Sequence, residues 1–186
     1  TLLYILIVCI LSTIHQSALI LIPMYFIAQG EPWNKRTMLF IGCIVLAMIF
    51  TTKFTNLLTD VVEQTDYATS VEEFRNTDDG TSIIRILVES IPIILAFIYR
   101  EKIKDKLTPI IKLSINMSLI ASGFYIISKI VNSGILLGRL PIYFSIYNLI
   151  LLPWLLNNIF EKKEKNLIYY IMIVCYFAFF YYQMII

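Results

Sequence analysis

Apolar stretches alternate with polar segments along the whole chain, and their lengths predict membrane-spanning helices. The stretches are Leu2–Ala28, Thr37–Thr51, Ile83–Tyr99, Pro109–Val131, Leu140–Phe160 and Leu167–Ile186. A hydrocarbon core of ~30 Å takes about 20 helical residues to cross. The second and third stretches are shorter, so they need residues from the flanking segments. We therefore expect an all-α fold, a polytopic transmembrane helical bundle of about six spans.

The first stretch contains a cluster of polar residues near its middle. Between Ser12 and Ser17 every residue except Ile14 is polar, and His15 is the only histidine in the chain. Because a helix completes a turn in about 3.6 residues, these side chains point in all directions, and such a segment cannot face lipid comfortably. One interpretation is a hydrogen-bonded packing patch, in which serines allow a close approach of helices. The other is a long helix that is broken or kinked near Ser12–Ser17 and lines a substrate cavity.

The polar segments differ in charge and so predict an orientation in the membrane. The basic residues lie mostly in the first, third and fifth segments: Lys35, Arg36, Arg100, Lys102, Lys104, Lys106, Lys162, Lys163 and Lys165. The second segment, Thr52–Ser82, is long and acidic, and the fourth carries only Lys129 and Arg139 near its ends. The positive-inside rule places the basic segments in the cytoplasm, and the other segments and both termini outside. Within the extracytoplasmic loop, residues 52–82, a helical spacing predicts a short helix on the membrane surface, formed by Leu57, Leu58, Val61 and Val62.

Composition supports an integral membrane protein and excludes several other classes. Hydrophobic residues make up 59% of the chain and the mean hydropathy is +0.78, far above the norm for soluble domains. A net charge of +2 gives no nucleic-acid footprint. The cysteines, Cys9, Cys43 and Cys175, lie in apolar runs without CxxC spacing, so we expect no metal site and no cofactor. Because the chain enters an apolar run at Thr1, we expect residues 1–186 to be a single transmembrane domain, the C-terminal part of a longer protein.

A charged pair lies inside the third apolar stretch. Arg85 and Glu89 are four residues apart, so they share one face of a helix and can pair. Pro92 follows and predicts a kink. The pair is either self-neutralised and directed to the outer surface, or it forms a charged wall of an outward-facing cavity.

The segment "GRLPIYFSIYN", residues 138–148, combines an arginine with two tyrosines at the start of the fifth stretch. Pro141 suits the first turn of a helix, and the spacing of Arg139, Tyr143 and Tyr147 places all three on one face. They form either an interface belt, which both residue types favour, or an anion site. In the second case the arginine binds phosphate oxygens and the tyrosines stack on sugars.

Three of these stretches together resemble a known family, the EpsG/Wzy-type bacterial polysaccharide polymerases. They are "STIHQSALILIPMYF", "SIIRILVESIPIILAFIYREK" and "GRLPIYFSIYNLILLPWLL". The resemblance implies that His15, Arg85, Arg139 and Tyr143 match patterned positions of the family. It also implies a longer protein, whose preceding part contributes residues to the site.

The resemblance implies a polymerase that joins lipid-linked oligosaccharide repeats at the outer face of the bacterial cytoplasmic membrane, making capsule or exopolysaccharide. Its partners would be the undecaprenyl-diphosphate-linked oligosaccharide, membrane lipids and other polysaccharide-assembly proteins. Such a transfer needs cationic groups at the departing diphosphate, which arginine supplies without a metal, and a base for the acceptor hydroxyl. We therefore expect His15, Glu89 and Arg139 to be catalytic, and Arg85, Tyr143 and Tyr147 to bind substrate. A transporter or flippase component is the main alternative, and a non-catalytic membrane scaffold is a third.

Overall fold

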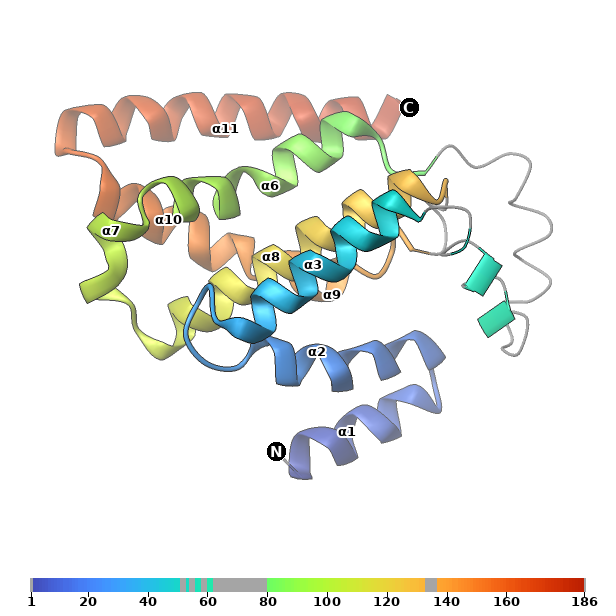
Figure 1. The fold of residues 1–186 in the computed structure, drawn as a ribbon. Coiled ribbons are helices and arrows are strands. Elements are labelled where there is room, and N and C mark those ends of the chain that lie inside the picture. The colour runs from blue at the N-terminus through green and yellow to red at the C-terminus, as the bar shows by residue number, and fades with distance from the viewer. Residues whose placement is uncertain are drawn as a thin grey trace.

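The computed structural model describes residues 2–50, 53, 56–57, 60–61, 80–132 and 137–185. Every element that it describes there is helical (Figure 1), which confirms the all-α prediction. The α-helices are α1 (Leu2–Ser12), α2 (Leu21–Ala28), α3 (Lys35–Ile49), α6 (Ile83–Ile98), α7 (Arg100–Ile103), α8 (Pro109–Ile130), α9 (Ile142–Ser145), α10 (Asn148–Ile159) and α11 (Lys162–Ile185). Two 3-10 helices join them, η1 (Gln16–Ile20) and η2 (Lys104–Lys106).

Three helical segments of the described chain are long and apolar enough to cross a membrane. They are α8, the combined α9–α10 segment Ile142–Ile159, and α11. These correspond to the fourth, fifth and sixth predicted spans. Helices α3 and α6 have 15 and 16 residues, which is short of the about 20 that a crossing takes. The helix α6 continues through Pro92 without interruption.

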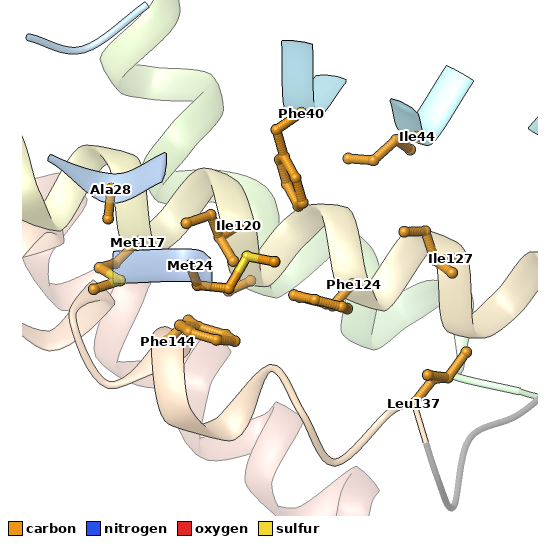
Figure 2. Close-up of a cluster of buried hydrophobic side chains, with 11 residues drawn as sticks. Met24, Ala28, Phe40, Ile44, Met117, Ile120, Phe124, Ile127, Leu137 and Phe144 are labelled. Carbon is orange, nitrogen blue, oxygen red and sulfur yellow. The ribbon is translucent and has the colours of Figure 1, made fainter. Parts of the chain in front are cut away.

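The central helix of the bundle is α8, which contacts α2, α3, α6, α9 and α10. One apolar cluster packs it against α2, α3 and α9 (Figure 2), and a second packs it against α6 and α10. In the first cluster, Phe124 stacks on Phe144 with ring centroids 5.8 Å apart. Gly123 allows α3 to approach closely, since a Cβ atom there would lie 2.5 Å from Ile44 Cδ1 and 2.8 Å from Phe40 Cε1. This close packing fixes α8 as the element around which the others are placed.

The first apolar stretch is broken where its polar cluster lies, as predicted, and the chain then reverses direction. The hydroxyls of Ser12 and Thr13 donate to the carbonyls of Cys9 and Ile10, both at 2.7 Å, which satisfies backbone acceptors at the helix end. Helix α1 before the break and helix α2 after it run side by side as a hairpin (Figure 1). The sequence did not predict this reversal. The prediction that Leu2–Ala28 crosses the membrane once, with the N-terminus at the outer face, is therefore wrong. This stretch forms a hairpin whose tip is the polar cluster.

The contacts that establish the hairpin join its two arms. Tyr4 stacks on Tyr25 with ring centroids 4.5 Å apart, and its hydroxyl donates to the Leu21 carbonyl at 3.4 Å. In a continuous helix, with about 1.5 Å of rise per residue, Tyr4 and Tyr25 would lie too far apart to touch. The stacked pair is therefore direct evidence that the chain reverses.

The three basic segments gather at one end of the bundle, here called the basic end. Lys112, at the start of α8, forms an ion pair with Glu31 of the first segment. Lys102 and Lys106 of the third segment donate to carbonyls at the end of α10, at 2.5 and 3.4 Å. Lys165 of the fifth segment donates to the Asn157 side chain at 3.1 Å. The alternation of charge thus grouped these segments correctly.

At the end of the bundle opposite the basic end, the start of α6 packs against the end of α8. The Thr81 and Ser128 hydroxyls are 2.7 Å apart and buried. Gly80 has a φ of +73°, and a Cβ atom there would lie 2.6 Å from the Ser128 carbonyl oxygen, so only glycine fits. The acidic segment preceding Gly80, with its predicted surface helix, lies almost wholly outside the described residues.

Candidate functional site

Glu89 lies within the apolar helix α6, and its carboxylate is held by an asparagine from another helix. The Asn148 amide donates to Glu89 Oε2 at 3.1 Å and to the Glu89 carbonyl at 3.2 Å. Asn148 is buried, and it is the first residue of α10, next to the short helical turn at Ile146 and Tyr147 that links α9 to α10. The turn therefore presents a side-chain donor to α6 within an apolar region.

Arg85, one helical turn earlier, is held by the last helix. With its amide oxygen facing the guanidinium, Gln183 accepts from Arg85 Nε and Nη2 at 2.6 and 2.7 Å. The predicted ion pair between Arg85 and Glu89 does not form, because neither partner is within ion-pair distance of the other. The two charges share a helix face as predicted, but each is bound by a neutral carboxamide from a different helix.

Further polar groups surround Glu89, and together with Arg85 and Gln183 they form what we call the charged cluster. The hydroxyls of Tyr125 on α8 and Tyr176 on α11 lie within electrostatic range of the Glu89 carboxylate. Tyr125 is also hydrogen-bonded to Ser145 of α9. Helices α6, α8, α9, α10 and α11 therefore all contribute to this cluster.

Three buried oxygen atoms have no hydrogen-bond partner within the described part of the chain. They are Ser118 Oγ, Ser122 Oγ and Asn148 Oδ1. Helical spacing places Ser118, Ser122 and Tyr125 on the same side of α8 as Ile115, which packs against α6 and α10. Unpartnered buried polar atoms are uncommon in native structures, so this interface offers hydrogen-bonding capacity that the described part of the chain does not use.

A second group, the tyrosine cluster, comprises Tyr4, Tyr25, Tyr143 and Tyr147 with Ser17. The Ser17 and Tyr143 hydroxyls are 2.9 Å apart and join the hairpin to α9. Tyr147 lies within electrostatic range of the Tyr4 hydroxyl. The two predicted substrate-binding tyrosines therefore meet the hairpin, as the sequence did not anticipate.

His15 and Arg139 are exposed and lie on the segments that the tyrosine cluster joins. His15 has an extended backbone at the hairpin tip, two residues before Ser17. Arg139 lies in the turn before α9, four residues before Tyr143. Arg139 lies before the helix, so it does not share the predicted helix face. Tyr143 and Tyr147 keep the predicted spacing of one helical turn, because the backbone of Ile146 and Tyr147 between α9 and α10 stays in the right-handed helical region.

The junction of α9 and α10 connects the two clusters. Tyr147 packs against the apolar cluster that includes Met24 and Ala28 of α2, and the next residue, Asn148, binds Glu89. Arg85 and Glu89 thus lie on one side of the junction, and Tyr143 and Tyr147 on the other. No group of three or more His, Cys, Asp and Glu side chains within the described ranges is arranged to hold a metal ion.

Sequence reasoning missed the partners that position the charged residues. Asn148 and Gln183 are carboxamides in otherwise apolar runs, and Ser17 belongs to the polar cluster of the hairpin tip. Polar side chains in membrane-embedded helices usually find polar partners. That general expectation was the available signal, but it does not say which helix supplies the partner.

Comparison with known proteins gives one relationship. No curated protein and no solved structure matches the chain significantly. The EpsG family matches residues 1–186, the whole chain. The apolar helices of this chain and the family match along its whole length agree with the resemblance carried by the three sequence stretches. The chain belongs to the EpsG family.

Proposed function

We propose that this protein is a polysaccharide polymerase of the bacterial cytoplasmic membrane. It transfers undecaprenyl-diphosphate-linked oligosaccharide repeats to build capsule or exopolysaccharide. Family membership supports polymerase-type function. The observation that carries the proposal is the pairing of Glu89 with Asn148 and of Arg85 with Gln183 inside an apolar bundle, next to the tyrosine cluster. Charged groups inside membrane domains are costly and usually serve function.

The proposed chemistry assigns one role to each group. The acceptor hydroxyl attacks the anomeric carbon of the donor sugar, the bond to the diphosphate breaks, and undecaprenyl diphosphate leaves. Glu89 takes the hydroxyl proton, and Asn148 orients its carboxylate. Arg85 stabilises the negative charge that develops on the leaving diphosphate. Tyr143 and Tyr147 stack on sugar rings.

His15 and Arg139 are assigned to the side of the site that receives the second lipid-linked repeat, the acceptor. Both are exposed, on segments joined by the contact of Ser17 with Tyr143. Arg139 would bind a phosphate of the arriving headgroup with two N–H groups at once. His15 would bind the sugars or take the acceptor proton in place of Glu89.

The proposal includes a membrane topology with six crossings. Helices α3, α6, α8, α9–α10 and α11 each cross, with flanking residues completing α3 and α6. The remaining crossing is the first along the chain and runs from the hairpin tip through η1 and α2 to Lys35. Helix α1 precedes the tip and lies beside this crossing as the other arm of the hairpin. The basic end faces the cytoplasm, so the hairpin tip and Arg139 face outside, where the lipid-linked repeats would be joined.

Lipid analysis of a deletion strain tests the function. We expect single lipid-linked repeats to accumulate on the outer leaflet, and the full-length gene to restore polymer. Repeats trapped on the inner leaflet would show a flippase instead. Unchanged surface glycans would exclude both functions and favour a scaffold.

A further inference from the structure

Helix α11 is the least buried long helix of the described chain. None of its residues is buried. It lies along the outside of the bundle beside α6 (Figure 1). A helix in this position separates α6 from the surrounding lipid.

The contacts of α11 with α6 are polar. The Tyr182 and Ser82 hydroxyls are 3.4 Å apart, and the Gln183 amide oxygen binds Arg85 at 2.6 and 2.7 Å. Further along, Tyr176 lies near the Glu89 carboxylate. The end of α11 thus covers the start of α6, and the Gln183 side chain is directed at Arg85.

Gln183 leaves the positive charge of Arg85 without a contacting negative charge. No acidic side chain in the described ranges forms an ion pair with Arg85. Hydrogen bonds to an anion are stronger than those to a neutral amide, and the difference grows where water is excluded. An anionic oxygen that reached Arg85 would therefore displace the Gln183 oxygen.

We propose that α11 is a lateral door, and that Gln183 occupies a phosphate-binding subsite on Arg85 until a lipid-borne phosphate replaces it. A lipid-linked substrate keeps its hydrocarbon chain in the bilayer, so its headgroup enters from the side. The weakly packed α11 is the element that covers the charged residues from that side. The inference rests on the proposed function for the identity of the lipid, and on the contacts of Arg85 for the anion chemistry.

Binding of undecaprenyl phosphate to the full-length protein in nanodiscs tests the subsite. Gln183→Glu places a carboxylate on Arg85, so we expect binding to weaken by about tenfold or more. Gln183→Ala removes the competitor, so binding should be unchanged or tighter. The control Asn166→Asp adds a negative charge at an exposed position of the same helix and should leave binding unaltered. Equal weakening by Gln183→Ala and Gln183→Glu would indicate a structural contact only and overturn the proposal.

Inorganic pyrophosphate is the second probe and distinguishes a lipid-borne phosphate from a free one. A response of undecaprenyl phosphate to Gln183→Glu, with or without a response of pyrophosphate, supports entry from the bilayer. If Gln183→Glu weakens the binding of pyrophosphate alone, the proposal that a lipid headgroup enters past α11 is overturned. If binding responds as expected but no sugar is transferred, the proposed polymerase function fails and the phosphate subsite stands.

Reversible cross-linking tests the movement of α11. In a variant lacking Cys9, Cys43 and Cys175, Ser82→Cys and Tyr182→Cys are bridged with a reducible bifunctional reagent. We expect undecaprenyl phosphate binding to fall by about tenfold and to recover on reduction. The control pair, Thr81→Cys with Ser128→Cys, joins α6 to α8 across hydroxyls 2.7 Å apart and should not change binding. Full binding with α11 bridged would disprove the door.

Discussion

Glu89 lies in an apolar helix, where the Asn148 amide donates one hydrogen bond to its carboxylate and one to its backbone carbonyl. Glu89→Gln preserves the size of the side chain but removes the proton acceptor. Because general-base catalysis contributes roughly 10²–10⁴-fold, we expect a loss of that order in polymer synthesis from purified lipid-linked repeats. Expression should be unchanged. The matched control is Glu101→Gln on α7, which is exposed at the basic end. A rate within a few-fold of wild type would leave His15 as the base.

Arg139 is exposed in the turn before α9, on the segment that Tyr143 joins to the hairpin. If it binds the diphosphate with two N–H groups, Arg139→Lys keeps the charge but loses one charge-assisted bond. That bond is worth roughly 1.5–3 kcal/mol, about tenfold to a hundredfold in rate. The same polymer assay measures it, with Arg100→Lys at the basic end as control. Wild-type rates for Arg139→Lys would make Arg139 an interface anchor and leave Arg85 as the phosphate ligand.

The partners of the charged residues show what the sequence predicts at this scale. Arg85 and Glu89 were identified because charges are rare in apolar helices, and their spacing placed them on one face. The ion pair that their spacing allows is not formed, and each side chain instead contacts a carboxamide, Asn148 for Glu89 and Gln183 for Arg85. Spacing within a helix is fixed by its period, whereas partners from other helices depend on how the bundle packs. The residue types of the site were therefore predictable, but its geometry was not.

At the scale of elements, the packing of α3 on α8 depends on Gly123. A side chain there would overlap Phe40 and Ile44, so Gly123→Leu should lower the free energy of unfolding by about 1–3 kcal/mol. The matched control is Gly42→Leu, on the exposed face of α3, where a Cβ atom would meet nothing within 4 Å. Thermal unfolding in detergent measures both variants. Similar midpoints for the two would show that α3 does not pack tightly on α8. Recovery of stability by adding Phe40→Ala to Gly123→Leu would locate the clash.

The hairpin shows what the sequence predicts at the scale of elements. A full turn of polar side chains predicted a break at Ser12–Ser17, and the helix does end at Ser12. The stacking of Tyr4 on Tyr25 joins the two arms of the hairpin, and the hydrogen bond between Ser17 and Tyr143 joins the hairpin to α9. These contacts join distant positions, so hydropathy alone does not reveal them. The same holds for the fifth stretch, where Asn148 at the start of α10 meets Glu89 of α6.

For the whole molecule, the charge alternation grouped the basic segments, and their contacts gather at one end of the bundle. Grouping does not assign that end to a side of the membrane, which is a prediction from the positive-inside rule. Removing Cys9, Cys43 and Cys175 leaves a background for single cysteines. Thr69→Cys, in the acidic segment, should react with an impermeant maleimide on intact cells. Lys163→Cys, at the basic end, should react only after the cells are permeabilised.

The orientation decides whether the proposed chemistry has access to its substrate. The start of α6 and the end of α11 lie together, opposite the basic end, because Ser82 contacts Tyr182 and Arg85 contacts Gln183. The charged cluster is therefore nearer the end that the acidic segment enters. If Thr69→Cys is labelled on intact cells, Arg85 lies toward the outer leaflet, on the side of the membrane where the lipid-linked repeats would be joined. If only Lys163→Cys is labelled, the cluster faces the cytoplasm, and a polymerase acting at the outer surface is excluded.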